Sequence, residues 1–243
     1  GRLVDLGYGR YDFSTVDTCV RAAEAHQICV IWDLCHYGFP KNLTSLSPSF
    51  ARRFADYCHA VAHYLRSRVD GSLWFTPINE PSFMAYAGGE VGLFAPWLTG
   101  RGFDLKVTLA EAAIAGIDAI RAVDPEARIV NVDPMCRVVA PAGRTDLEED
   151  VEDFNERLVF QAWDMLCGRL LPELGGSPKH LDIVGMNYYW TNQWEVGSAC
   201  KCGWHCAASW RRGSATRITG GACADRMAPI RIRGHDIGDG AHW

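Results

Sequence analysis

Residues 73–81, Leu73-Trp-Phe-Thr-Pro-Ile-Asn-Glu-Pro81, are a short apolar run that ends in two polar residues and a proline. The run predicts a strand over 73–78, because its own proline lies close to the end, where a lost ladder hydrogen bond matters least. Asn79 and Glu80 follow this strand directly. We therefore expect a strand whose carboxyl end presents an amide and a carboxylate.

Three further apolar runs, 28–34, 128–133 and 181–189, also predict strands, because short β-rich apolar runs are typical of strands buried on both faces. Residues 79–102 contain several glycines and prolines and are expected to form a long loop. Helical spacing of apolar residues predicts helices from Ser14, as N-cap, to about Gln27, from Ser47 to near Gly71, from Leu105 to Val123, and from Leu147 to Leu170.

Helices that alternate with strands indicate parallel pairing, either in a doubly wound sheet or in a closed barrel. The barrel is favoured because polar residues follow each strand at its carboxyl end, and in a barrel these ends meet at one mouth. A Gly-x-Gly-x-x-Gly turn of the dinucleotide-binding type is absent from the sequence. The predicted class is α/β, a partial (β/α)8 TIM barrel over residues 1–197, followed by an irregular tail over 198–243.

The two predicted parts differ in charge and in their use of cysteine. Residues 1–197 carry 17 basic and 26 acidic side chains, whereas 198–243 carry 7 and 3. An acidic body and a tail without a dense basic block argue against nucleic acid as a partner. No apolar run is long enough for a membrane helix, and scattered cysteines in apolar segments favour the cytoplasm. The tail cysteines, Cys200, Cys202 and Cys206 with a distant Cys223, fit zinc spacing poorly, so no metal is predicted.

The resemblance to a known family is carried by three motifs in order. Residues 74–81 resemble the acid/base signature at the end of the fourth strand of family 1 glycoside hydrolases. Trp32-Asp-Leu-Cys-His-Tyr-Gly-Phe-Pro40 resembles that family's third-strand histidine motif, and Asp182-Ile-Val-Gly-Met-Asn-Tyr-Tyr189 its sixth-strand motif. Together with residues 9–14, which are similar to the stretch after the second strand, the resemblance covers about residues 8–196.

The resemblance implies a retaining β-glycosidase that acts on a small carbohydrate or glycoside and uses no cofactor. Glu80 would be the acid/base, and Asn79 and His36 would bind sugar hydroxyls. Tyr189 would donate its phenol to the nucleophilic carboxylate, and Asn187 is a neighbouring candidate. Structural roles stay open: His36 could satisfy a loop carbonyl, and Tyr189 could be a rim aromatic. Among the tryptophans, Trp97 and Trp194 are the expected cleft residues.

The sequence also departs from the family. It has no segment like that of the nucleophilic glutamate at the end of the seventh strand, and no glutamate follows Glu195. We therefore expect little hydrolysis by this chain. We also expect that the chain is a fragment that begins inside a gene, and that a frame shift near Gly197 produced the tail. The alternatives are a non-catalytic carbohydrate-binding remnant, and another glycosidase of the same clan, of the cellulase, mannanase or galactosidase type.

Overall fold

A computed structural model describes residues 4–7, 9–40, 42–190 and 192–196. These residues fall into two compact units, which are described separately. The first comprises the chain up to Met135 together with 156–188, and the second comprises 136–155 and the chain from Tyr189 onward. The predicted tail over 198–243 lies outside the described residues.

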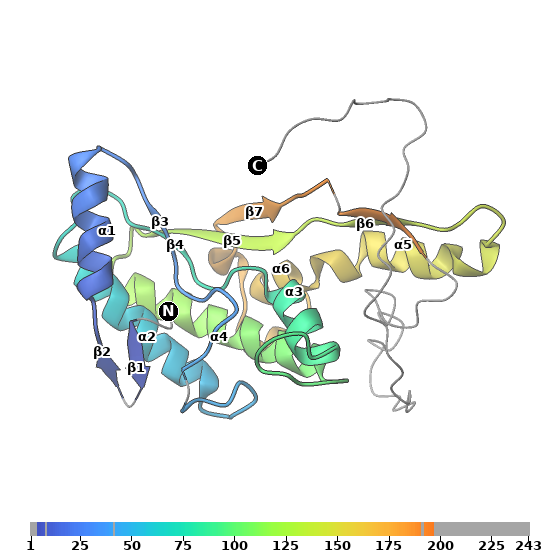
Figure 1. Cartoon of the computed structure of the whole chain (residues 1–243), viewed down its shortest axis with the longest axis horizontal. Helices are drawn as coiled ribbons and strands as arrows, with labels where there is room; N and C mark the ends of the chain where they lie inside the picture. The colour runs from blue at the N-terminus through green and yellow to red at the C-terminus, as the bar shows by residue number, and fades with distance from the viewer. Residues whose placement is uncertain (1–3, 8, 41, 191, 197–243) are drawn as a thin grey trace. The chain divides into compact units, whose positions relative to one another are not determined.

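A four-stranded parallel sheet forms the centre of the first unit, with the strands in the order β3-β4-β5-β7 (Figure 1). Each of the four predicted strands is present: three are shorter than their apolar runs, and β5 extends one residue beyond its run. An antiparallel pair, β1 and β2, precedes them. The strands are β1 (Asp5–Gly7), β2 (Arg10–Tyr11), β3 (Ile31–Asp33), β4 (Trp74–Thr76), β5 (Arg128–Pro134), β6 (Arg137–Val139), β7 (Ile183–Asn187) and β8 (Gln193–Glu195).

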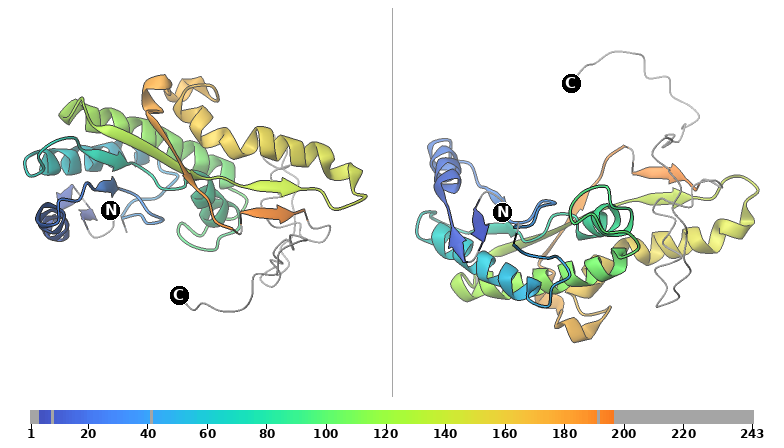
Figure 2. Two further views of the ribbon diagram at one scale, coloured as in Figure 1. Left: turned by 90° about the horizontal axis from the view of Figure 1, so that it is seen from above. Right: turned by 60° about the horizontal axis from the view of Figure 1, so that its bottom comes forward.

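Helices follow these strands as parallel pairing requires. In both views, α2 and α4 lie side by side along one face of the sheet (Figures 1 and 2). The helices are α1 (Ser14–Ala25), α2 (Phe50–Arg66), α3 (Pro81–Met84), α4 (Gly102–Val123), α5 (Glu148–Glu156) and α6 (Gln161–Leu166), with a π-helix η1 (Ala85–Glu90) and 3₁₀ turns η2 (Thr145–Leu147), η3 (Leu158–Phe160), η4 (Pro172–Leu174) and η5 (Pro178–His180).

The close approach of α2 and α4 depends on a glycine. A Cβ atom at Gly116 of α4 would lie 2.9 Å from the Cys58 sulfur and 3.0 Å from the Phe54 ring of α2. No side chain can be added there unless the neighbours shift. Cys58 and Leu65 of α2 are fully buried, so the two helices share a dry interface that covers the sheet.

Three predictions of local structure are wrong. Ser14 is the first residue of α1 and not its N-cap; its amide is instead bonded by the carboxylate of Asp12, at 2.9 Å. The acidic segment 147–170 is divided among η2, α5, η3 and α6 and is not one helix. The expected loop over 79–102 begins with α3 and η1, which are buried and not exposed.

The second unit contains a parallel pair, β6 and β8, and most of α5. Asn155 of α5 joins helix and strand, because its side chain accepts the N–H of Val138 at 3.0 Å and donates to the carbonyl of the same residue at 2.9 Å. Trp194 of β8 meets Phe154 edge to face, with ring centroids 6.2 Å apart. Trp194, named above as an expected cleft residue, therefore lies on a strand.

Candidate functional site

The carboxyl ends of β3, β4 and β5 are joined by backbone hydrogen bonds that continue beyond the strands themselves. The Asn79 N–H donates to the carbonyl of Cys35 at 3.0 Å, and the Glu80 N–H donates to that of Val132 at 2.9 Å. Glu80 itself has left-handed backbone angles, with φ 50° and ψ 60°, and α3 starts at the next residue. The turn that carries Glu80 is thus held between the segments on either side of it.

Glu80 is 6% exposed, and its carboxyl group is hydrogen-bonded to neighbouring side chains. Its Oε1 accepts a hydrogen bond from the amide of Asn187 at 2.7 Å, and its Oε2 accepts one from the Tyr37 hydroxyl. Asn79 donates to the Tyr37 oxygen at 3.2 Å and accepts from Asn187 at 3.3 Å. Tyr37, after β3, and Asn187, at the end of β7, therefore bond the same carboxyl group, and both of its oxygens act as acceptors.

An aromatic cluster lies beside this carboxyl group. The ring of Tyr37 is 5.6 Å from that of Phe83 and 5.3 Å from that of Phe94, and these two phenylalanines are 5.9 Å apart. All three are half-buried or partly exposed. Flat apolar faces next to hydrogen-bonding groups are the features that sugar rings require of a binding site.

The predicted site residues are distributed as follows. Asn187 donates to both Asn79 and Glu80, as described. His36 lies on an exposed loop, where its Nδ1 is 2.6 Å from a carboxylate oxygen of Asp33 and its ring is 4.5 Å from that of Tyr37. Trp97 is 67% exposed on the loop after η1. Tyr189 is 59% exposed and belongs to the second unit.

Tyr37 was not among the predicted residues, although it stands within the quoted third-strand motif. Its backbone has a φ of 55°, a left-handed conformation that an L-residue adopts only when its surroundings hold it there. This geometry carries the phenol towards Glu80. The only sequence signal was its place directly after His36, and that signal did not distinguish a binding residue from a rim aromatic.

A buried acid lies behind the Glu80 turn. Asp133, near the end of β5, is 1% exposed, and its Oδ1 accepts the N–H of Ser82 at 3.0 Å. Burial raises the pKa of Asp133 to about 7, although the nearby charge of Lys106 lowers it. Lys106 of α4 is 2% exposed and donates to the Gln161 side chain at 3.1 Å; burial lowers its pKa to about 8.

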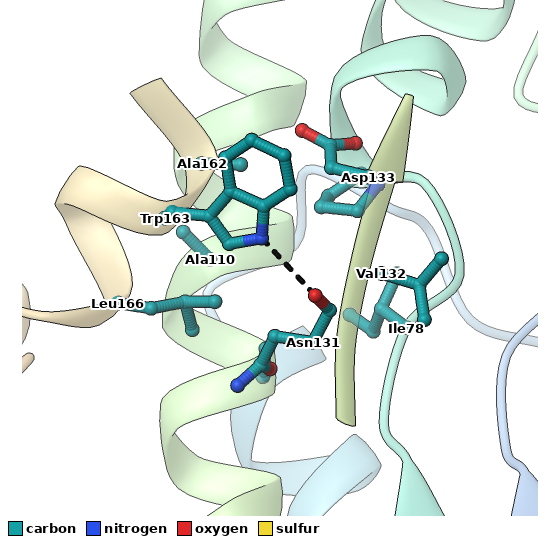
Figure 3. A pocket seen from close by; sticks show the side chains of 10 residues that line it. Ile78, Ala110, Asn131, Val132, Asp133, Ala162, Trp163 and Leu166 are labelled. Atoms are coloured by element: carbon teal, nitrogen blue, oxygen red, sulfur yellow. Dashed lines mark hydrogen bonds between the residues drawn. The ribbon is translucent and has the colours of Figure 1, made fainter. Parts of the chain in front are cut away.

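Two cavities of the first unit do not include Glu80 in their lining, although Pro81 and Asp133 line the first of them. One lies between β5 and the helices, where the Trp163 indole donates to the carbonyl of Asn131 at 3.1 Å (Figure 3). The other is lined largely by apolar residues between β3 and α2, including Leu34 and Phe50. Within residues 4–196, gaps excepted, no group of three or more His, Cys, Asp or Glu side chains could hold a metal ion. The tail cysteines lie outside that range.

No helix in the described part of the chain combines the length and the apolar character that a transmembrane helix needs.

Solved structures with the same fold include glycosidases. The chain is similar to the β-glucosidase from Thermotoga maritima in complex with deoxynojirimycin, at a TM-score of 0.62 and 18% identity, covering 77% of this chain and 48% of that one. The same enzyme in complex with noeuromycin gives 0.63 and 18%, over 82% and 50%. The AHE enzyme from Alicyclobacillus herbarius gives 0.63 and 20%, over 77% and 48%.

The chain spans about half the length of these structures. No model of a protein family matches the sequence, and no curated protein matches it either. Because the identities are low, the likeness establishes the fold and nothing finer. The prediction of an α/β fold that corresponds to part of a barrel is confirmed.

Proposed function

We propose that this chain is the central part of a retaining β-glycosidase of family 1, with Glu80 as its acid/base. The proposal rests above all on the Glu80 carboxyl after β4, which Asn187 and Tyr37 both bond and which Asn79 reaches through these two residues. The fold shared with a β-glucosidase supports it. Its substrate would be a small carbohydrate or a glycoside.

The chemistry would begin with a proton transfer. In a retaining enzyme, the acid/base protonates the leaving oxygen while a second carboxylate, about 5–5.5 Å away, attacks the anomeric carbon. Glu80 fits the first role because it is fixed by its backbone and by its neighbours. Asn79 and His36 would bind hydroxyls of the same ring, and Trp97 would stack against the sugar. Tyr189 would serve the nucleophile of a complete barrel.

The role of the nucleophilic carboxylate has no candidate residue in the sequence. Protonation without a nucleophile leaves most of the barrier in place, so we expect this chain to bind sugars and to hydrolyse them poorly. Release of nitrophenol from an aryl β-glucoside measures this directly. A turnover rate within the usual enzymatic range, about 1–1000 per second, would contradict the expectation.

Sugar binding tests the proposal itself. Deoxynojirimycin is a basic sugar mimic, so it should bind near the Glu80 carboxylate, and calorimetry should detect this with the full chain. Glu80→Gln removes the charge and should weaken binding by roughly 10- to 100-fold, since a hydrogen bond to a charged group contributes about 1.5–3 kcal/mol.

A matched control is Glu90→Gln, in the same segment. The Glu90 carboxylate accepts the Gly102 N–H at 3.1 Å, at the start of α4. Its replacement should leave sugar binding unchanged. Equal affinity in wild type and Glu80→Gln, or no binding of the mimic at millimolar concentration, would contradict the proposal.

A non-catalytic carbohydrate-binding remnant is the second candidate function. One observation favours it: both oxygens of Glu80 are already bonded within the protein. If hydrolysis stays absent when the chain is joined to the missing half of a homologous barrel, whereas sugar binding persists, the remnant is the better description. Cleavage of cellulose or mannan chains by that fusion would indicate another glycosidase of the same clan.

A further inference from the structure

The buried carboxyl group of Asp133 has no role in the proposed reaction, yet it contacts the segment that carries Glu80. Its Oδ1 accepts the backbone N–H of Ser82, two residues after Glu80, at 3.0 Å. Its Oδ2 has no hydrogen-bond partner among the residues that the structure describes. A buried acid held in this way costs stability, which calls for an explanation beyond packing.

The turn at Glu80 needs such a contact. A left-handed conformation at a residue with a side chain costs about 1–3 kcal/mol and persists only where the surroundings enforce it. Three contacts enforce it here. The Asn79 amide is bonded to Cys35 on one side, and the amides of Glu80 and Ser82 are bonded to consecutive residues of β5, Val132 and Asp133, on the other.

The Asp133 contact differs from the other two because it comes from a side chain. Backbone contacts hold the position of the turn relative to the sheet, but a side-chain acceptor fixes the first turn of α3 after the left-handed residue. Although α3 continues directly into η1, the first N–H groups of a helix have no acceptor within it, and that of Ser82 is bonded by Asp133 instead. The direction of the Glu80 side chain therefore depends on this bond.

We propose that Asp133 is a positioning residue, which holds the left-handed turn at Glu80 through the Ser82 N–H and so directs the Glu80 carboxyl to Asn187 and Tyr37. Lys106 supports it from α4, because its charge favours the carboxylate form of Asp133. The inference rests on the proposed role of Glu80, but its geometry can be tested without any sugar.

The side-chain amide of Asn187 is the probe, because it donates to Glu80 at 2.7 Å. Its two proton–nitrogen signals can be assigned in the full chain as those that vanish in Asn187→Asp. Glu80→Ala then gives the position of these signals without the Glu80 acceptor. Asp133→Ala should move them most of the way to that position, whereas Asp133→Asn, which keeps an acceptor for Ser82, should leave them near the wild-type position.

A control variant separates this pattern of shifts from the effect of a general loss of stability. Asp124, 6% exposed, also accepts a backbone N–H, from Glu126 at 3.1 Å, and an arginine, Arg66, at 3.0 Å. Asp124→Ala should destabilise the protein and leave the Asn187 signals in place. Signals that stay in the wild-type position in folded Asp133→Ala would overturn the proposal, as would equal shifts in Asp133→Asn and Asp133→Ala.

Asp133→Ala removes the carboxyl group near the buried ammonium of Lys106 and could prevent folding. The double variant Asp133→Ala/Lys106→Met removes both charges, a change that buried ion pairs often tolerate. It should show the same shift as Asp133→Ala, and an unshifted signal in this folded variant would also overturn the proposal. Deoxynojirimycin titration is a separate readout: if wild type binds no sugar but the signals respond as expected, only the proposed function fails.

Discussion

The inner strands β4 and β5 differ sharply from the outer strands β3 and β7 of the same sheet. Phe75 and Ile129, on the inner pair, are fully buried, whereas Ile31 on β3 is 51% exposed and Met186 on β7 is 61% exposed. The same contrast continues at the carboxyl ends, where Glu80 is buried and His36 is exposed. The centre of the candidate site is therefore fixed by the sheet, and its periphery depends on a few side-chain contacts.

The contrast is tested most strongly by truncating one apolar side chain from each kind of strand. Phe75→Ala should lower the free energy of unfolding by about 3–5 kcal/mol, because it leaves a cavity in a close-packed core. Met186→Ala should change it by less than about 0.5 kcal/mol. Urea unfolding followed by circular dichroism measures both. Equal losses would show that the outer strand is as well packed as the inner pair.

The second test uses pH and the buried pair at the end of β5. The pKa of Asp133 is raised from 3.8 to about 7, so the folded protein binds this proton more tightly than the unfolded chain. Its contribution to stability is complete below pH 3.8 and is lost as pH rises through about 7. Lys106, with a pKa of about 8, keeps its proton over most of this window.

The double variant Asp133→Asn/Lys106→Met lacks both groups. Between those pH values, its free energy of unfolding should therefore fall less with rising pH than that of the wild type. Urea unfolding at several pH values gives the two slopes. Carboxyl groups whose pKa is lowered by partners, such as Asp182 beside Arg128, affect both proteins alike. Parallel curves would mean that Asp133 does not titrate there.

Tyr37 connects the two regions, because it lies on the loop after β3 and its hydroxyl reaches Glu80. Tyr37→Phe keeps the ring among Phe83 and Phe94 but removes the hydrogen bond. We expect a loss of about 0.5–1.5 kcal/mol in stability, together with weaker binding of the sugar mimic. Unchanged stability and unchanged affinity would show that the phenol is not coupled to the carboxyl group.

The smallest effect is expected at His36, on the exposed edge. Its side chain is 60% exposed, and its contact with Asp33 is open to solvent. His36→Ala should change the free energy of unfolding by less than about 1 kcal/mol, as is typical of exposed ion pairs. If His36 binds sugar hydroxyls, the affinity for deoxynojirimycin should still fall, so calorimetry separates the two roles. A change in stability larger than that in Tyr37→Phe would contradict the contrast between centre and edge.

The strands of the sheet could be predicted because each is a short apolar run, as is typical of buried strands in a parallel sheet. The structure of the segment after Glu80 could not be predicted in this way. Its glycines read as a loop, but Gly88 allows η1 to approach the chain at Ala95, whose carbonyl oxygen would lie 2.8 Å from an added Cβ atom. Such contacts join residues that are close only in the folded chain, so no local pattern reveals them.

The same reason explains which site residues were found. Asn79 and Glu80 follow β4 and Asn187 ends β7, so parallel pairing alone brings them to the same edge of the sheet. Tyr37 reaches the site through its left-handed backbone conformation, and Asp133 contacts the turn that carries Glu80. Neither property is visible in the sequence. The roles of Trp97 and Tyr189 stay predictions, as does the origin of the tail.

The left-handed backbone at Glu80 also means that stability and the proposed function favour different residues at this position. Glycine adopts this conformation without a steric penalty, so Glu80→Gly should cost the fold less than Glu80→Ala, by about 1 kcal/mol. At this position, the residue best suited to the backbone is one that can hold no proton. A screen for heat resistance alone would thus tend to select away the group on which the proposed activity depends.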